Sequence, residues 1–369
     1  MQEANTTKEN WDSYCTLELG ILEPILKELG YTLEEDQKHL KGERFLMQAI
    51  TTESGKKLIL TGKSDTQVPV IIKATRDDAG KKEIEHERSC RSILHRINFA
   101  AEVFHSPKEL VYTESHGFLI SIQEYITQEK SFLDRPTEEQ FQFALRSFKA
   151  QEGAHATTYK HQKTIGKAFE IRTPETYLNN FQNFVETVSR SLPDNSTLQK
   201  LLTDTKKELQ EHAQTIEQYC GFLTHTDFVP HNIRIKDKTV YLLDHSSLAF
   251  GNKYEGWARF INFMVLYNQP LQKAFEQYVQ DNRSEGEQET LRLMRLYRLG
   301  EIICYYTGTL ERSEDSLLEL NKARIEFWQK VLEHKLANTP LPEEIVESYK
   351  TKRDSLRSED EIARQKGLH

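Results

Sequence analysis

The sequence predicts an α+β protein with two lobes: a small lobe built on β-strands with one long helix, and a larger, mostly helical lobe. Up to residue 126, short β-branched and apolar runs alternate with turn-forming residues, and one long helical pattern interrupts them. Beyond it, apolar residues recur mainly at helical spacing. We therefore expect an N-terminal helical extension (1–40), a β-rich lobe (41–126), a helical lobe (127–340) and a charged C-terminal tail (341–369).

Length and composition narrow the class of protein. A chain of 369 residues suits a two-lobed protein, and its 37% hydrophobic and 29% charged residues are typical of a globular one. Neither a membrane-length apolar run nor a secretory signal is present, so we expect a cytoplasmic protein without a membrane segment. The net charge of −8 argues against a nucleic-acid partner. Four scattered cysteines indicate free thiols rather than a zinc site or disulfides.

The small lobe is expected to follow an amphipathic helix over 11–29, which Gly30 closes and which we expect to pack on that lobe. Three strands are predicted over 45–51, 57–61 and 68–73, because β-prone runs there are separated by turn residues.

A helical pattern over 82–97 follows the third of these strands and carries Glu83 and Glu87. Two further strands are predicted over 109–113 and 118–126.

The large lobe should consist of helices, with a loop at 248–254 before one of them. Apolar positions at helical spacing predict these helices over 137–155, 174–190, 196–219, 257–267, 271–281, 289–307 and 317–337.

One stretch of the large lobe carries residues suited to phosphoryl transfer. Asp227 and Asn232 lie five positions apart in a Pro-containing loop, and Asp244 ends an apolar run. The β-prone runs 233–235 and 239–243 predict a hairpin that returns Asp244 to the loop. Carboxylate and amide oxygens are ligands that magnesium prefers, and a carboxylate can orient a hydroxyl group for attack on phosphate.

The pattern His225-x-Asp227-x-x-x-x-Asn232, followed by a strand ending in Asp244, resembles the aminoglycoside phosphotransferase and choline kinase group, which shares the protein-kinase fold. The resemblance spans about residues 40 to 335 and implies ATP and magnesium as cofactors. It implies Asp227 as the catalytic base and Asn232 and Asp244 as magnesium ligands. The sequence departs from the family at His245, where an aromatic residue is usual, and lacks a glycine-rich phosphate loop, so that 52–55 would cover the nucleotide.

The same resemblance assigns nucleotide-binding roles in the small lobe. Lys73 resembles the strand lysine that binds the α and β phosphates of ATP, and Glu87 resembles its ion-pair partner, with Glu83 as the alternative. The segment 120–126 resembles the hinge between lobes, where Gln123 would border the adenine and the backbones of Glu124 and Ile126 would bind it.

The leading hypothesis is an ATP-dependent phosphotransferase that acts on a hydroxyl group of a small molecule. Aminoglycosides, choline, amino sugars, homoserine and macrolides remain possible acceptors, and the oligomeric state stays open. One alternative is a nucleotide-binding pseudokinase that serves as an interaction module. Another is a hydrolase with transition-metal ligands among His225, Asp227, His231, Asp244 and His245.

Overall fold

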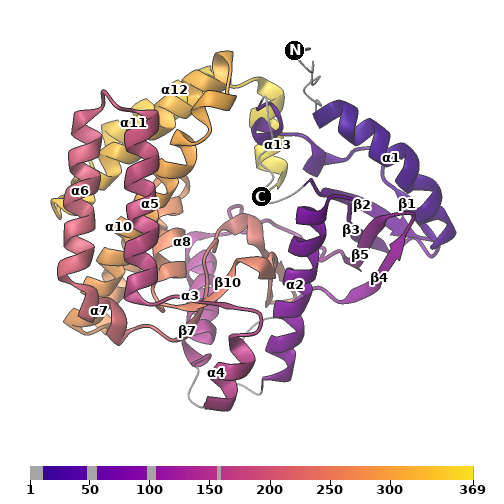
Figure 1. Ribbon diagram of the computed structural model, residues 1–369, viewed down its shortest axis with the longest axis horizontal. Coiled ribbons are helices and arrows are strands. Elements are labelled where there is room, and N and C mark those ends of the chain that lie inside the picture. The colour runs from indigo at the N-terminus through magenta and orange to yellow at the C-terminus, as the bar shows by residue number, and fades with distance from the viewer. Residues whose placement is uncertain (1–10, 48–55, 98–104, 156–158, 369) are drawn as a thin grey trace, which may run out of the picture.

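The small lobe is built on a five-stranded antiparallel sheet, seen at the right of the computed structural model in Figure 1. The structure describes residues 11–47, 56–97, 105–155 and 159–368. The strand order is β1-β2-β3-β5-β4. The strands are β1 (Tyr31–Leu33), β2 (Leu58–Ser64), β3 (Pro69–Thr75), β4 (Glu109–Ser115) and β5 (Phe118–Glu124).

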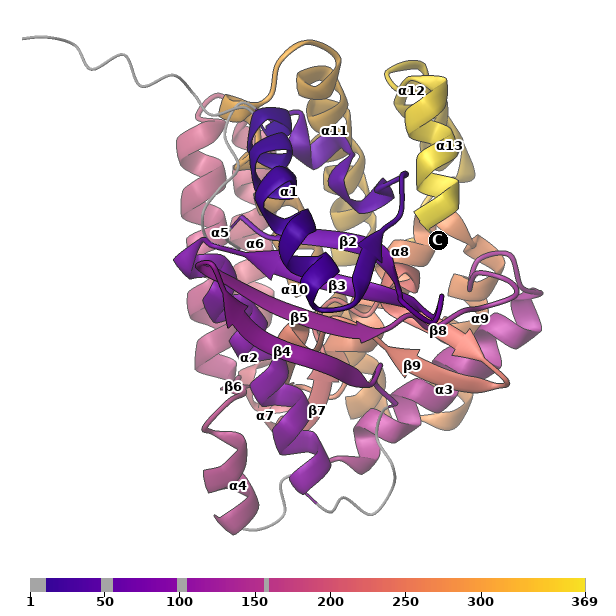
Figure 2. The same cartoon turned by 90° about the vertical axis from the view of Figure 1, so that its right-hand side faces the viewer.

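Two helices flank this sheet. Side chains alternate between the faces of a strand, so Leu58 and Leu60 point to one face and Ile59 to the other. The first face is covered by α1 (Trp11–Glu28), which shares a hydrophobic core with β2, β3 and β5, as Figure 2 illustrates. On the other side lies α2 (Asp78–Arg96), whose buried residues Cys90 and Ile93 contact the large lobe.

The prediction of a strand over 45–51 is wrong in its described part. Glu43–Phe45 forms a short 3-10 helix, and residues 48–51 lie outside the described residues, as do residues 52–55. The strand beside β2 is instead β1, within the expected N-terminal extension. Phe45 stacks on Trp11 of α1 with ring centroids 4.3 Å apart, so this segment belongs to the small-lobe core.

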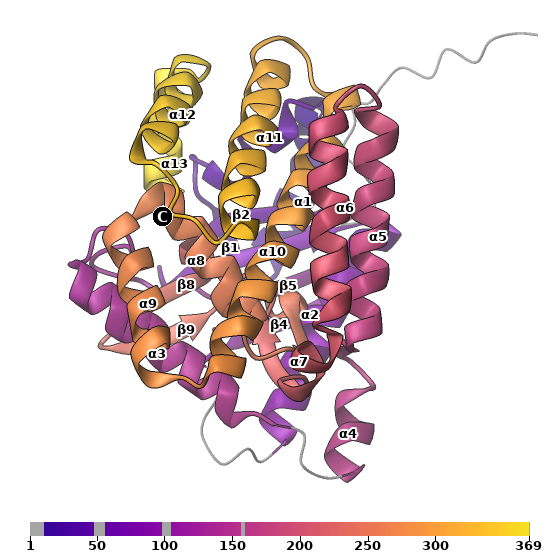
Figure 3. The same ribbon diagram turned by 90° about the vertical axis from the view of Figure 1, so that its left-hand side faces the viewer.

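The large lobe is mostly helical, and Figure 3 shows α5, α6, α10 and α11 side by side in it. The predicted α+β fold with two lobes is therefore confirmed. None of the described helices is long and apolar enough to cross a membrane. The helices of this lobe are α3 (Thr137–Gly153), α4 (Tyr159–Ile165), α5 (Pro174–Ser191), α6 (Ser196–Glu211), α7 (Ala213–Gln218), α8 (Glu255–Tyr267), α9 (Gln269–Asn282), α10 (Glu285–Thr307) and α11 (Asp315–Leu336).

Two small sheets complete the large lobe. The predicted hairpin is present as β8 (Ile233–Lys236) and β9 (Thr239–Leu242), paired with Ile233 opposite Leu242. The other sheet has the order β6-β10-β7, from Glu170–Ile171, Leu248–Gly251 and Phe222–His225. The expected loop at 248–254 therefore begins with a strand.

The charged residues after position 341 form two helices, α12 (Glu343–Ser355) and α13 (Glu359–Leu368). Val346 and Tyr349 of α12 are buried in the large-lobe core, so α12 is more than an exposed tail.

Candidate active site

A cleft of about 390 Å³ separates the β3–β5 side of the small lobe from the β8–β9 hairpin. The predicted site residues that line it are Lys73, Glu87, Gln123, Glu124, Ile126, Asn232 and Asp244. Asp227 is absent from its lining and lies at the loop just before Asn232.

A buried ion pair joins β3 to α2 inside this cleft. Lys73 Nζ lies 2.5 Å from Glu87 Oε2, whereas the alternative partner Glu83 pairs with Lys57. The Glu87 side chain is 5% exposed. Burial alone would raise its pKa, but the charge and hydrogen bond of Lys73, together with Arg91 and Lys57, lower the pKa of Glu87 to about 2. The pair therefore fixes an ammonium group at the wall of the cleft.

The end of β5 forms the opposite part of the small-lobe wall. Gln123 and Ile126 are buried, and Gln123 pairs with Ile71 of β3 in the sheet. The backbone N–H of Glu124 donates to the carbonyl of Lys108 at 2.9 Å. At Glu124 the carbonyl is thus the backbone group left for a ligand in the cleft.

The loop after β7 holds Asp227 between two partners. Asn232 Nδ2 donates to the backbone oxygen of Asp227 at 2.9 Å and to its Oδ2 at 3.1 Å. On the other side, Arg259 Nε of α8 donates to Asp227 Oδ1 at 2.9 Å. Although burial opposes ionisation, Arg259, His225 and Arg298 lower the pKa of Asp227, so its carboxylate is charged at neutral pH.

Asp244 lies two residues after the end of β9 and has a left-handed backbone conformation, with φ 53° and ψ 60°. This conformation is uncommon for a residue with a side chain. Two serine hydroxyls, Ser246 Oγ at 2.5 Å and Ser247 Oγ at 2.6 Å, donate to its carboxylate oxygens. The ring Nε2 of His225 donates to the carbonyl of the preceding Leu243 at 3.0 Å, which anchors the strand end.

His245 follows Asp244 and is the position at which the sequence departs from the family that it resembles. It is buried against α2, where the cleft wall includes Glu87 and Arg91. Burial, chiefly, lowers the pKa of His245 to about 3, so the ring is neutral and packs as an uncharged flat group.

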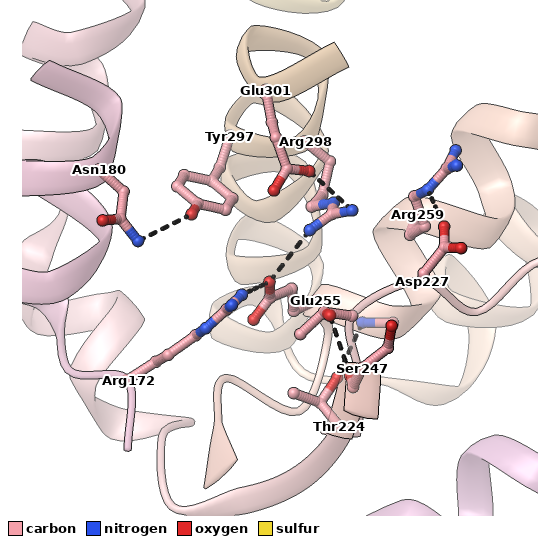
Figure 4. Close-up of polar contacts among 12 residues, drawn as sticks. Arg172, Asn180, Thr224, Asp227, Ser247, Glu255, Arg259, Tyr297, Arg298 and Glu301 are labelled. Carbon is pink, nitrogen blue, oxygen red and sulfur yellow. Dashed lines mark hydrogen bonds and ion pairs between the residues drawn. The ribbon is translucent and has the colours of Figure 1, made fainter. Parts of the chain in front are cut away.

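Arg259 is the main site residue that the sequence did not reveal. The helix that carries Arg259 also takes part in a network of buried ion pairs (Figure 4). Glu255, fully buried at the start of α8, pairs with Arg172 and with Arg298 Nη1 at 3.3 Å. Arg298 also pairs with Glu301 at 2.7 Å. This network ties α8 to α10, and so holds the backbone that carries Arg259.

The transition-metal alternative finds no support in the geometry. Among the described residues, the one group of three side chains close enough to share a metal ion is Glu208, His212 and Glu289. None of the five residues proposed as ligands belongs to it.

No protein-family model matches the sequence, and no curated protein sequence matches it. Solved structures do resemble it. Aminoglycoside phosphotransferase APH(4)-Ia superposes with a TM-score of 0.56 at 13% identity, over 88% of this chain and 99% of that chain.

A thermostable mutant of that enzyme in a ternary complex with AMP-PNP and hygromycin B gives a TM-score of 0.54 at 14% identity, over 78% and 92% of the two chains. A macrolide 2'-phosphotransferase type I superposes with a TM-score of 0.53 at 15% identity, over 84% of this chain and 97% of that chain. The protein therefore has the two-lobed, protein-kinase-like fold of the aminoglycoside and macrolide phosphotransferases.

Proposed function

We propose that the protein is an ATP-dependent phosphotransferase that transfers the γ-phosphoryl group to a hydroxyl group of a small molecule. The observation that carries the proposal is that Asn232 and Asp244 lie at the cleft and Asp227 lies next to Asn232. Asp227 and Asn232 are hydrogen-bonded to each other, and Asn232 and Asp244 line the same cleft as the Lys73–Glu87 pair. Phosphoryl transfer depends mainly on positioning and on charge stabilisation, which such an arrangement supplies.

In this proposal the small lobe binds the nucleotide. Lys73, held by Glu87, contacts the α and β phosphates, and the backbone carbonyl of Glu124 and the N–H of Ile126 bind the adenine beside Gln123. The apolar side chains Ile59 and Ile71 line the same wall of the cleft and provide a surface for the adenine ring.

Asn232 and Asp244 are the residues that would hold magnesium, and their hydrogen bonds fit that role. Asn232 uses its amide nitrogen on Asp227, which leaves its amide oxygen for a metal. Each Asp244 oxygen accepts one serine hydroxyl and retains a second lone pair. A bound magnesium ion would supply charge neutralisation at the phosphate oxygens.

Asp227 is the proposed base. Its carboxylate stays ionised beside Arg259, so it can accept a hydrogen bond from the acceptor hydroxyl and take up its proton. A low pKa makes Asp227 a weak base, but in a loose transition state the base serves chiefly to orient the hydroxyl.

The pseudokinase alternative would need the nucleotide pocket without the transfer chemistry. The presence of Asp227, Asn232 and Asp244 at one place favours the enzyme. ATP consumption by the purified protein, with magnesium and a panel of hydroxyl-bearing metabolites and antibiotics, tests the proposal. We expect acceptor-dependent ADP formation that falls about a hundredfold to ten-thousandfold in Asp227→Asn. Binding of ATP without ADP formation under any condition would favour the pseudokinase.

A further inference from the structure

A second pocket, of about 190 Å³, lies beside the catalytic loop in the large lobe. It is formed by α8, α10, α11 and α12, by Arg357 just after α12, and by His231, which also lines the nucleotide cleft. Arg259, the partner of Asp227, is part of its wall. A ligand in this pocket would therefore lie beside Arg259, the residue that holds the Asp227 carboxylate.

The walls of this pocket combine aromatic rings with guanidinium groups. Its size suits a small ring, since a cavity of about 150 Å³ can hold benzene. The aromatic residues are Phe263, Tyr267, Tyr306, Trp328 and Tyr349, and the arginines are Arg259, Arg324, Arg353 and Arg357.

Arginines carry the formal charge in the described wall of the pocket. Among the residues that the structure describes, no Asp or Glu lines it. The side chains of Arg324 and Arg357 are only 9% and 5% exposed, so water screens them poorly. Burial of like charges around one small cavity is costly unless an anion compensates them.

The carboxylates that pair with these arginines approach from outside the pocket. Asp227 pairs with Arg259, and Asp354, half exposed, pairs with Arg353. Glu43 of the small lobe pairs with both Arg324 and Arg357, the latter at 2.5 Å. Glu43 demonstrates that the Arg324–Arg357 pair accepts a carboxylate.

We propose that this pocket selects an acceptor carrying a carboxylate or phosphate group next to a flat ring, with the anionic group bound by Arg324, Arg353 and Arg357. The inference rests on the proposed function and names the class of its acceptor. Cationic acceptors such as aminoglycosides, choline or amino sugars would meet a wall that contains four arginines and, among the described residues, no carboxylate. The acceptor's anion competes with Glu43 for the arginine pair.

The test is a binding measurement with four matched probes that each carry a hydroxymethyl group on a benzene ring. Two are anions, para-(hydroxymethyl)benzoate and para-(hydroxymethyl)phenyl phosphate. The other two are the neutral para-xylylene glycol and the cationic para-(hydroxymethyl)benzylamine. Each is titrated calorimetrically into the full-length protein saturated with magnesium and AMP-PNP. AMP-PNP binding is measured first, so failure of the nucleotide site counts against the proposed function and not against the charge of the pocket.

The wild-type protein is expected to bind at least one of the two anionic probes about tenfold or more tightly than the neutral and cationic probes. The identity of the tighter-binding anion shows whether the pocket prefers a carboxylate or a phosphate. Arg357→Gln and the more exposed Arg353→Gln should each weaken that anion about tenfold. The charge-matched control Arg190→Gln, on exposed α5 surface, should not. Glu43→Gln should strengthen anion binding, because it releases both arginines.

Several results would overturn the proposal. These are tighter or equal binding of the neutral or cationic probe, no binding of either anion at the highest concentration tested, or anion affinity that survives both arginine substitutions. Anion affinity that is unchanged or reduced in Glu43→Gln would show that the anion does not compete for the Arg324–Arg357 pair, and would also overturn it.

Discussion

Replacing Lys73 should damage stability and nucleotide binding separately, and a second substitution should restore only stability. In Lys73→Met the carboxylate of Glu87, 5% exposed, keeps Arg91 nearby but loses its direct partner. Breaking one side of a buried ion pair costs about 3 to 5 kcal/mol. The lowering of the Glu87 pKa from 4.5 to about 2 independently corresponds to roughly 3 kcal/mol in favour of the ionised form. We therefore expect a loss of about 3 kcal/mol in the free energy of unfolding.

The double variant Lys73→Met, Glu87→Gln removes both charges and should recover most of this loss, because no uncompensated charge remains. It should still bind ATP poorly, since the ammonium group is absent. Urea unfolding measures the first quantity and calorimetric ATP titration the second. Lys63→Met is the control, because Lys63 is 44% exposed and lies 3.6 Å from Glu34 at the surface.

The same pair has a pH signature. The folded-state pKa of Glu87 lies below its ordinary value, so its stabilising contribution is present above pH 4.5 and is lost as the pH falls toward about 2. The double variant should lack this part of the acid dependence. A Lys73→Met protein that unfolds at the wild-type urea concentration, or binds ATP with unchanged affinity, would refute the reasoning.

Three further predictions concern the large-lobe side of the cleft. Asp244→Asn should reduce magnesium-dependent ATP binding and turnover together. Calorimetric ATP titration with and without magnesium measures this effect, and an unchanged magnesium dependence would show that Asp244 has another role. Arg259→Gln should raise the pKa of Asp227 toward its ordinary value, so the acid limb of the kcat profile should move to higher pH; an unmoved limb would exclude Asp227 as the titrating base. His245→Phe should weaken the pH dependence of unfolding, because a neutral buried histidine costs stability as the pH falls from 6.5 toward about 3; identical profiles of the two proteins would contradict this.

The hairpin and the small-lobe sheet were accessible from the sequence because they are local patterns. The β-branched runs around Asp237 and Lys238 specify two strands and a tight turn, and the structure pairs them as β8 and β9. Likewise, the apolar strand ending near Lys73 and the helix carrying Glu87 follow one another directly, so their contact needed only a strand-to-helix turn.

The errors fall where long-range contacts decide the structure. Phe45 looked like the start of a strand, but stacking on Trp11, far back in the chain, places it in a 3-10 segment. The short strand Tyr31–Leu33 is defined by its pairing with β2 rather than by its own composition.

The pocket proposed for the acceptor was the least predictable part of the structure. Arg259 stands 32 residues after Asp227, on a helix whose apolar pattern gives no hint of that contact. The Glu43–Arg324 pair spans 281 positions. Net charge is equally uninformative here, because the chain is acidic overall while this pocket is lined by arginines.

The most direct test of the central claim is a single-turnover transfer from ATP labelled at the γ-phosphate, in the presence of magnesium and an acceptor found by screening. Phosphoryl transfer by this site predicts that the label appears in a phosphate ester of the acceptor, in equal amount to ADP. The rate should fall about a hundredfold or more in Asp227→Asn while ATP affinity is preserved. Label released only as inorganic phosphate, or an Asp227→Asn protein that transfers it at the wild-type rate, would contradict the account.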